Sequence, residues 1–296
     1  MSDGGAVRPH SRDLAPPASS RAVVVGTVRD CAGRIGTEVA RMGKALSGFR
    51  RIQWLLVESD SEDGTPSSLE ALARSREDFH FIRLGQLRDR LPARTARIAF
   101  CRNAYLEALR SDERYSGVDF VVVADFDGVN SLLTDSAIAS CWRRDDWDAC
   151  AANQRGRYYD IWALRHPEWS PNDCWMQYRF LTETGLSPAK AWSACVHSRM
   201  VRISADAPWI EVDSAFGGLA VYRRDPLVRC EYVGITSEGQ ELCEHVDLHA
   251  ALRAHGGRIF INPALINGDS LDHTDGRLIQ QRMTRMLGRI VARVTA

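Results

Sequence analysis

The sequence is poor in lysine and carries no excess of either charge. Of its 296 residues only Lys44 and Lys190 are lysines, so mechanisms that need a lysine are excluded at most positions. Lysine plus arginine and aspartate plus glutamate each number 38, which gives a formal net charge of zero. Nucleic-acid-binding domains normally carry a basic excess. We therefore expect no nucleic-acid partner.

Long apolar runs and closely spaced cysteine pairs are missing as well. No apolar run reaches the roughly 18–20 residues of a membrane-spanning helix. None of the eight cysteines forms a Cys-x-x-Cys pair, so no structural zinc site is expected. Because no secretory signal peptide is present, we expect a cytoplasmic protein with reduced cysteines. The arginine-rich stretch from Arg277 to Arg293 is predicted to be a helix with a solvated face, or else a peripheral membrane contact.

What the sequence does contain is a regular alternation of apolar runs and amphipathic stretches. Hydrophobic residues make up 45% and charged residues 26%, a balance typical of a globular protein. The pattern predicts strands at 21–26, 52–57, 80–84, 118–124 and 258–262, and helices at 33–46, 67–74, 94–109 and 244–255. The last strand is expected to end at Pro263. Alternating elements predict an α/β fold, in which helices flank a mostly parallel sheet and ligands bind beyond the carboxyl ends of the strands.

The chain is predicted to consist of a tail, one domain and a terminal helix. Residues 1–20 lack periodicity and are predicted to be a disordered tail, residues 21–275 form the α/β domain, and residues 276–296 form a C-terminal helix. The second half of the domain is less regular, and seven of the eight tryptophans lie between Trp142 and Trp209. These aromatic residues are predicted to form either a small core under a long loop or a platform for the flat face of a sugar.

The most informative stretch, Val121 to Gly128, joins an apolar strand to two aspartates one residue apart. Residues two apart in a strand point the same way, so Asp125 and Asp127 are expected to lie together. Neighbouring carboxylates repel each other unless a cation lies between them. Mg²⁺ and Mn²⁺ prefer oxygen ligands and usually keep substrate phosphates in their remaining positions. The stretch therefore predicts a metal–diphosphate site, the alternative being a polar loop that only ends the strand.

Polar side chains also follow the other predicted strands. After the first two strands come Thr27, Arg29 and Asp30, and then Glu58, Ser59 and Asp60. An acid after the second strand is well placed to accept hydrogen bonds from a base or ribose, although residues 58–65 also suit a helix cap with turn residues. Residues 125–128, which carry the predicted metal ligands, are called the metal loop below. Arg102, in the helix before the fourth strand, is expected to pair with a diphosphate or with an aspartate of this loop, or to form a surface salt bridge.

Seven stretches together resemble a known group of enzymes. Their sequences are Val25-Gly-Thr-Val-Arg-Asp30, Val57-Glu-Ser-Asp-Ser-Glu-Asp-Gly-Thr65, Cys101-Arg-Asn-Ala-Tyr-Leu106, Val123-Ala-Asp-Phe-Asp127, Tyr158-Tyr-Asp-Ile-Trp-Ala-Leu-Arg165, Phe216-Gly-Gly-Leu-Ala-Val-Tyr222 and Cys243-Glu-His-Val-Asp-Leu-His249. The first four resemble nucleotide-sugar-dependent glycosyltransferases of the GT-A fold. The last three resemble the fungal capsule-associated mannosyltransferase family and its bacterial relatives. The resemblance covers about residues 21–275.

The resemblance implies a GT-A fold with an irregular, aromatic-rich acceptor region. It implies metal-dependent transfer of a hexose from a nucleoside-diphosphate sugar, and the subfamily favours GDP-mannose. The acceptor would be a hydroxyl of a glycan, a lipid-linked saccharide or a protein.

The resemblance also implies roles for the matching residues. The donor pocket would be lined by Thr27, Arg29, Glu58, Asp60, Arg102, Asp125, Phe216, Gly217 and Gly218, with Asp60 near the base or ribose. Asp125 and Asp127 would hold Mn²⁺ or Mg²⁺, and His273 is placed to be a further metal ligand, although a lone histidine is more often structural. The metal would stabilise the departing nucleoside diphosphate.

The position of the acceptor-activating base departs from the resemblance. Many GT-A enzymes carry Glu-Asp at the start of a late helix, and in an inverting reaction the aspartate deprotonates the acceptor hydroxyl. Here the pair is Glu244-His245. The candidate catalytic residues are therefore His245, as a base or a metal ligand, Glu244, and Asp247. If the anomeric configuration is retained, no such base is required.

Three other functions compete with this interpretation. In a haloacid-dehalogenase-type phosphatase, Asp125 would be the nucleophile and Asp127 the acid/base, but that motif usually lies on the first strand, and Lys190 sits in no strand-associated site. A dinucleotide-binding oxidoreductase is disfavoured because Gly-x-Gly-x-x-Gly is absent. A non-catalytic relative that binds a nucleotide sugar, a glycan or a partner is the third alternative.

Overall fold

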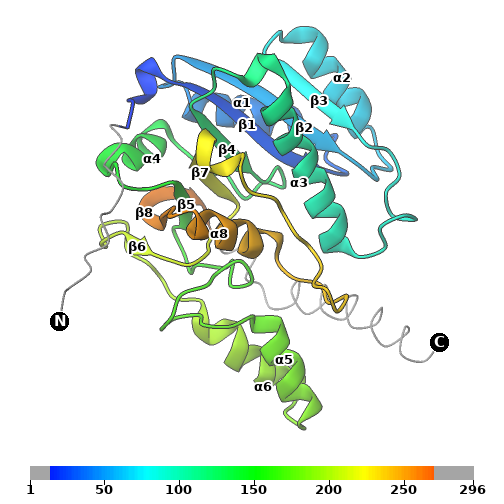
Figure 1. Ribbon diagram of the computed structural model, residues 1–296, viewed down its shortest axis with the longest axis vertical. Helices are drawn as coiled ribbons and strands as arrows, with labels where there is room; N and C mark the ends of the chain where they lie inside the picture. Colours follow the sequence, from blue (N-terminus) through cyan, green and yellow to red (C-terminus); the bar gives the residue numbers. More distant parts are fainter. Residues whose placement is uncertain (1–13, 270–296) are drawn as a thin grey trace, which may run out of the picture.

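One eight-stranded sheet runs through residues 14–269, which the computed structural model describes (Figure 1). Its strands are β1 (Arg21–Val28), β2 (Arg51–Glu58), β3 (Phe79–Arg83), β4 (Phe120–Ala124), β5 (Ala149–Gln154), β6 (Ile210–Glu211), β7 (Leu219–Arg223) and β8 (Ile259–Gly268). They lie in the order β3-β2-β1-β4-β7-β5-β8-β6. All run in one direction except β7 and β6, which are antiparallel to their neighbours. The predicted α/β fold with a mostly parallel sheet is confirmed.

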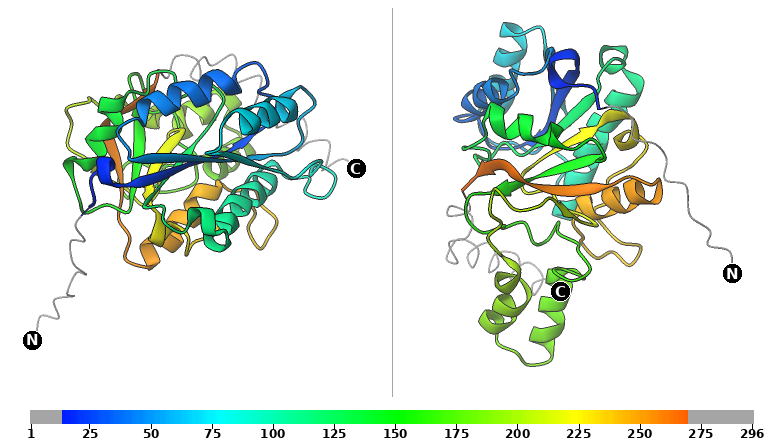
Figure 2. Two further views of the ribbon diagram at one scale, coloured as in Figure 1. Left: turned by 90° about the horizontal axis from the view of Figure 1, so that it is seen from above. Right: turned by 90° about the vertical axis from the view of Figure 1, so that its left-hand side faces the viewer.

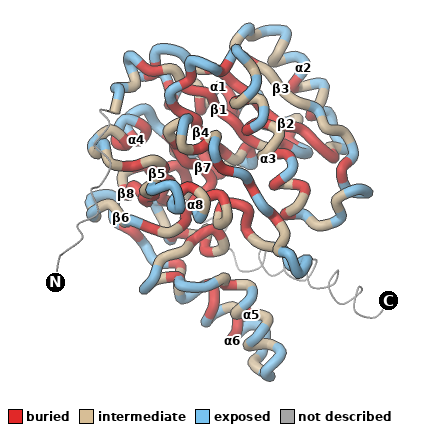
Figure 3. The backbone as a smooth tube through the Cα atoms, in the orientation of Figure 1, coloured by how far each residue is buried: buried red, intermediate tan, exposed pale blue. Residues whose placement is uncertain are grey.

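Helices cover both faces of this sheet (Figure 2). The helices of the main body are α1 (Ile35–Ala45), α2 (Thr65–Ser75), α3 (Arg94–Ser111), α4 (Asp135–Ala139), α7 (Arg224–Leu227) and α8 (Glu244–Ala254). Side chains alternate along β1, so Val24 joins the apolar cluster under α1, whereas Val23 and Val25 join the cluster with α3 and α8. Figure 3 shows the buried residues concentrated along the sheet between these layers.

Each end of the strands and helices predicted for the first half lies within two residues of its position in the structure. The last strand does not, because β8 continues past Pro263. Its pairing with β5 shifts register after Ala151, whose partner is Ile261, whereas Asn153 pairs with Ile266. Pro263 therefore lies in a bulge, where its missing N–H removes no regular ladder bond. The prediction that the strand ends at Pro263 is wrong for this reason.

Several elements of the second half were not predicted. Strand β5 ends in Asn153 and Gln154, which are buried although polar. Helices α5 (Cys174–Glu183) and α6 (Pro188–Cys195) form a hairpin that projects from the body of the molecule (Figure 1). Lys190 lies on α6 of this hairpin.

The aromatic residues between Trp142 and Trp209 pack mainly against one another and against the core. Tyr158 is buried and meets the Trp169 ring edge-on at 5.6 Å, and the Trp142 and Trp147 rings meet at 6.0 Å. Of the two predictions for this segment, a small aromatic core and a sugar platform, these contacts correspond to the aromatic core.

The ends of the chain lie partly outside the description. Within the predicted tail, residues 17–19 form a 3₁₀ turn, and the indole N–H of Trp142 donates to the Ala15 carbonyl at 2.9 Å. Residues 14–20 are thus packed against the domain, in contrast to the predicted disordered tail. Residues 1–13 and 270–296, including the predicted C-terminal helix and its membrane contact, lie outside the described residues. Within residues 14–269 no helix is long and apolar enough to cross a bilayer.

Candidate functional site

The sheet topology brings distant segments to one edge. Strands β1, β4 and β5 run in the same direction, so the residues that follow them lie at the same edge. Strand β7 runs the opposite way and therefore starts at this edge, so residues 216–218, which precede it, lie there too. Helix α8 precedes the parallel strand β8, which places its first residue, Glu244, on this side as well. The carboxyl edge therefore collects most of the predicted site residues.

Asp125 and Asp127 directly follow β4, as predicted. The ring between them, Phe126, is buried and turns into the opposite layer, where it would collide with any side chain at Gly26. Asp127 is exposed, and its carboxylate accepts the Val129 N–H at 3.2 Å. Asp125 keeps 35% of its side-chain surface exposed. Burial raises the pKa of Asp125 to about 7, and Arg102 opposes the shift while Asp127 adds to it.

Arg102 is the central cation of the site. Its guanidinium is buried and donates to Glu244 Oε1 at 3.0 Å and to Asp125 Oδ1 at 3.4 Å. It also lies over the rings of Phe216 and Tyr232, at 5.3 and 5.5 Å from their centroids. Arg102 thus ties the metal loop to the first residue of α8. The predicted pairing with an aspartate of the metal loop is observed, and the surface salt bridge is not.

The turn at Gly217 and Gly218 connects the metal loop to the rest of the edge. Both glycines have positive φ, +70° and +83°. A Cβ at Gly217 would lie 2.8 Å from the Ala152 carbonyl, and one at Gly218 would lie 2.8 Å from the Tyr159 hydroxyl. The Gly218 carbonyl accepts the Asp125 N–H at 3.0 Å. Glycine is favoured at both positions because any other side chain would be strained by the positive φ and would collide with these atoms.

Asp160 is a site residue that the sequence analysis did not single out. Its Oδ2 accepts the Gly217 N–H at 2.9 Å. Burial raises its pKa, while the N–H groups of Gly217 and Ala163 act in the opposite direction. The signal that could have identified it is its position a few residues beyond a strand, but β5 was not predicted.

His245 is enclosed by aromatic rings. It is 2% exposed, stacks on Phe216 with 3.9 Å between ring centroids, and meets Tyr232 edge-on at 5.6 Å. Both ring nitrogens are buried without a hydrogen-bond partner among the described residues. Burial lowers the pKa of His245 well below its usual range, and Arg102 adds to the shift. The ring is therefore neutral, and its 3.8 Å approach to Glu244 is not an ion pair. In this conformation no ring nitrogen is accessible to an acceptor hydroxyl.

The other two candidate bases are placed differently. Glu244 is buried and engaged by Arg102, which neutralises its charge. Asp247 lies one turn further along α8 and is only partly buried, and burial raises its pKa. A catalytic role for either residue stays a prediction.

The predicted nucleotide residues lie at the ends of β1 and β2. Thr27 is partly exposed and Arg29 is exposed. Glu58 is buried, and its carboxylate accepts the Ser61 N–H at 3.1 Å. Asp60 is 2% exposed, and its Oδ1 accepts the backbone N–H groups of Leu87 and Arg88 at 2.8 and 2.9 Å. In this conformation Asp60 anchors a loop of the protein, and its predicted place near the base or ribose stays a prediction.

The oxygen ligands that the site offers suit a hard divalent cation. Asp125 and Asp127 supply carboxylates, and Mg²⁺ or Mn²⁺ commonly uses one or two carboxylates together with phosphates and waters. Burial raises the pKa of Asp125 to about 7 although Arg102 lies 3.4 Å away, and a cation bound at this carboxylate would oppose that shift. Within residues 14–269 no group of three His, Cys, Asp or Glu side chains could hold a metal by itself. The third predicted ligand, His273, lies outside the described residues.

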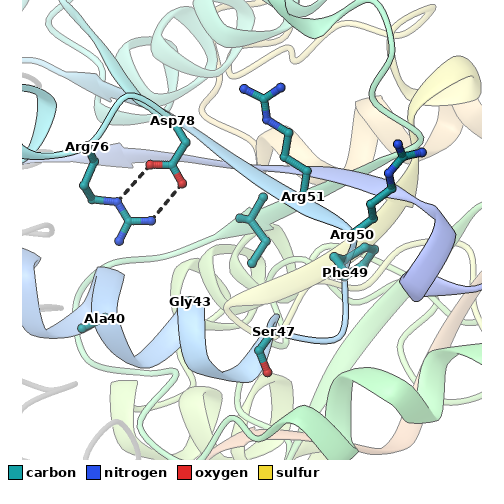
Figure 4. Close-up of a pocket in the computed structure, with 9 residues that line it drawn as sticks. Ala40, Gly43, Ser47, Phe49, Arg50, Arg51, Arg76 and Asp78 are labelled. Atoms are coloured by element: carbon teal, nitrogen blue, oxygen red, sulfur yellow. Dashed lines mark hydrogen bonds and ion pairs between the residues drawn. The ribbon is translucent and has the colours of Figure 1, made fainter.

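A hollow of about 530 Å³ lies elsewhere, at the opposite edge of the sheet. It is lined by residues that precede β2 and β3 and by the end of α1, among them Ser47, Arg51 and Asp78 (Figure 4). In Figure 4 the guanidinium of Arg76 turns towards Asp78, and the two form paired hydrogen bonds of 3.1 and 2.9 Å. Because ligands of such folds bind at the carboxyl edge, this hollow is not part of the candidate site.

Comparisons with known proteins give matches among solved structures only. No protein-family model and no curated protein matches the sequence. The chain is similar to the mannosyltransferase PcManGT from Pyrobaculum calidifontis, solved with GDP-Man and Mn²⁺, with 16% identity and a TM-score of 0.47 over 88% of this chain and 60% of that one. It is similar to glucosyl-3-phosphoglycerate synthase from Mycobacterium tuberculosis, solved with UDP, with 12% identity and a TM-score of 0.39 over 85% and 70%. TarS 1–349 from S. aureus gives 13% identity and a TM-score of 0.38 over 81% and 57%.

The chain spans 60% of the length of the first of these structures and 57% of the third. Similarity at this level names no donor, metal or acceptor for the chain.

Proposed function

We propose that the chain is a metal-dependent glycosyltransferase that moves a hexose from a nucleoside-diphosphate sugar to a hydroxyl of a glycan, a lipid-linked saccharide or a protein. The observation that carries the proposal is the pair Asp125 and Asp127, which follows β4 at the edge where ligands of such sheets bind. The sequence motifs that resemble GT-A glycosyltransferases lie at this same edge and give the proposal its reaction class.

The two aspartates are proposed to hold Mn²⁺ or Mg²⁺ against the donor diphosphate. A divalent ion held there would act as a Lewis acid and stabilise the charge that develops on the departing nucleoside diphosphate. Arg102 keeps Asp125 in place through its 3.4 Å contact. Because Arg102 is buried under Phe216 and Tyr232, its role is to position the carboxylate rather than to bind the diphosphate directly.

The nucleotide is proposed to lie over the ends of β1 and β2. Thr27 and Arg29 are accessible there, and the guanidinium of Arg29 can pair with a phosphate. Glu58 supports the turn that follows β2 through its bond to the Ser61 N–H. The motif resemblance favours GDP-mannose as the donor.

The acceptor is proposed to approach past the turn at Gly217 and Gly218. If the reaction inverts the anomeric centre, its base is one of His245, Glu244 and Asp247. His245 would first require movement of the rings that enclose it. A retaining reaction would leave His245 as a buried support for Phe216.

The proposal is tested by thermal stabilisation of the protein with UDP, GDP and CDP, each with and without Mn²⁺, followed by donor turnover. A ligand that binds only the native state raises the melting temperature by mass action. A metal-dependent shift with one nucleotide, together with transfer from the matching sugar nucleotide, is expected. A shift without turnover would indicate the non-catalytic relative. No shift, together with hydrolysis of p-nitrophenyl phosphate under Mg²⁺, would indicate the phosphatase instead.

A further inference from the structure

The segment that follows β5 contributes a carboxylate to the candidate site. Strand β5 runs parallel to β4, because both are antiparallel to β7 between them. Residues 155–160 therefore leave the sheet at the edge where Asp125 and Asp127 lie. Asp160 ends this segment and is partly exposed. The position puts a second acidic group beside the metal loop, on the side away from β1.

Hydrogen bonds fix the position of Asp160 relative to Asp125. The Gly217 N–H donates to Asp160 Oδ2 at 2.9 Å, and one residue later the Gly218 carbonyl accepts the Asp125 N–H at 3.0 Å. One two-glycine turn therefore holds both carboxylate residues. Tyr159 lies against the same turn, because a Cβ at Gly218 would come within 2.8 Å of its hydroxyl.

Two buried groups beside this turn have unsatisfied hydrogen-bonding atoms. Gln154 donates from Nε2 to the Gly217 carbonyl at 3.1 Å, yet its buried Oε1 has no partner among residues 14–269. Both ring nitrogens of His245, which stacks on Phe216, are likewise unsatisfied within the described chain. Buried polar atoms are normally paired, so each of these atoms requires a partner such as an ordered water. Gln154 and His245 thus lie beside the turn at Gly217 and Gly218, which also binds Asp160.

The other carboxylates at this edge already have partners or an assigned role. Glu244 is neutralised by Arg102, and Asp125 and Asp127 are the proposed metal ligands. Among residues 14–269 Asp160 accepts backbone N–H groups, those of Gly217 and Ala163, which orient a carboxylate without using all of its acceptor sites, about four in number. A carboxylate with spare acceptor sites is suited to neighbouring hydroxyl groups, which donate to it in charge-assisted hydrogen bonds.

We propose that Asp160 binds hydroxyl groups of the hexose that is transferred and so distinguishes a nucleotide sugar from the nucleotide alone. This inference rests on the proposed glycosyltransferase function. The metal loop and the ends of β1 and β2 would bind the nucleoside diphosphate, whereas Asp160, oriented by Gly217, would recognise the sugar. Because different residues would bind the sugar and the nucleoside diphosphate, a substitution of Asp160 should weaken binding of the sugar and leave binding of the nucleoside diphosphate nearly unchanged.

The test compares the dissociation constants of GDP and GDP-mannose, and of UDP and UDP-glucose, in the presence of Mn²⁺. The variant is Asp160→Asn, whose side-chain oxygen can still accept the Gly217 N–H while its NH₂ group cannot accept from a sugar hydroxyl. We expect the affinity for the nucleoside diphosphate to stay within about threefold of wild type. The affinity for the matching sugar nucleotide should fall by about 10- to 100-fold, the range for losing hydrogen bonds to a charged group.

The outcomes separate this inference from the proposed function. If wild type shows no metal-dependent nucleotide binding, the glycosyltransferase proposal fails and the role of Asp160 fails with it. If wild type binds nucleotides but Asp160→Asn binds the sugar nucleotide as wild type does, only the role of Asp160 is overturned. Equal losses for nucleotide and sugar nucleotide would also overturn it, because they indicate a general effect on the site.

A second test changes the substrate and the protein together. Monodeoxy analogues of the donor sugar each lack one hydroxyl. At least one of them should bind wild type more weakly than the parent sugar nucleotide does. That same analogue should lose little or nothing in Asp160→Asn, because its missing partner is already gone. Equal sensitivity of wild type and variant to every deoxygenation would contradict the contact.

Discussion

Replacing Arg102 by methionine should destabilise the protein strongly and in a way that a second substitution can repair. Arg102 is 3% exposed and pairs with Glu244 at 3.0 Å and with Asp125 at 3.4 Å. Methionine preserves much of the apolar stem but removes the charge. Glu244, whose side chain is 8% exposed, is then left buried without a counter-charge.

The size of the effect follows from this burial. Removing one partner of a buried ion pair costs about 3–5 kcal/mol, because the other charge stays desolvated and unpaired. Asp125 contributes less, since 35% of its side chain remains exposed to water. We therefore expect Arg102→Met to lower the free energy of unfolding by about 3–5 kcal/mol.

Urea denaturation of four proteins checks this expectation. They are wild type, Arg102→Met, the double variant Arg102→Met/Glu244→Gln, and Arg74→Met as a control. Arg74 pairs with Glu70 at 3.9 Å on the surface, and its loss should cost less than about 1 kcal/mol. The double variant should recover about 1–3 kcal/mol of the loss, because the stranded charge is gone. A loss in Arg102→Met as small as that in Arg74→Met would refute the reasoning, and so would a double variant no more stable than Arg102→Met.

Three further predictions follow from groups around the same edge. Because the pKa of Asp125 is raised to about 7, Mn²⁺ must displace a proton from this carboxyl at lower pH. Calorimetry in the presence of the nucleotide should therefore show the affinity for Mn²⁺ falling by up to about tenfold from pH 7 to pH 6. An unchanged affinity would contradict the assignment of Asp125 as a metal ligand. Burial lowers the pKa of His249 to about 3, below its usual 6.5, so the unfolded chain binds an extra proton between these values. His249 alone should therefore lower the free energy of unfolding by about 2 kcal/mol from pH 7 to pH 5, measured as the difference in pH dependence between wild type and His249→Gln, and the same pH dependence in both would argue against a buried neutral ring. Gly217→Ala should lose more stability than Gly239→Ala. Both glycines have positive φ, +70° and +78°, but of the two only Gly217 would bring the added Cβ close to other atoms, the Ala152 carbonyl at 2.8 Å among them. Equal losses in thermal denaturation would show that this contact does not affect stability.

Much of the first half of the fold follows from the sequence because local patterns decide it. The apolar runs of β1, β2 and β4 are buried on both faces, and a run of this kind is readable without knowledge of its neighbours. The position of Asp125 and Asp127 at the end of β4 follows from the same pattern.

The features that the sequence did not predict depend on contacts between residues far apart in the chain. Near its end strand β5 contains Asn153, a polar residue that is tolerated inside because its amide donates to the carbonyls of Ile203 and Pro263. Asp160 was missed because β5 was missed. The pair Arg102 and Glu244 lies 142 residues apart in sequence, and no local pattern announces it. The place of Asp60 after a strand is visible in the sequence, whereas its bonds to the loop at Leu87 are not.

The central claim is that Asp125 and Asp127 bind a nucleoside diphosphate through a divalent metal, and Asp127→Asn tests it most directly. Asp127 is exposed, so the substitution should leave the melting temperature of the free protein unchanged. We predict that the Mn²⁺-dependent rise in melting temperature with GDP or UDP, present in wild type, is lost in Asp127→Asn. It should persist in Asp206→Asn, which changes an exposed aspartate outside the site. A nucleotide- and metal-dependent rise that is the same in Asp127→Asn and in wild type would contradict the account.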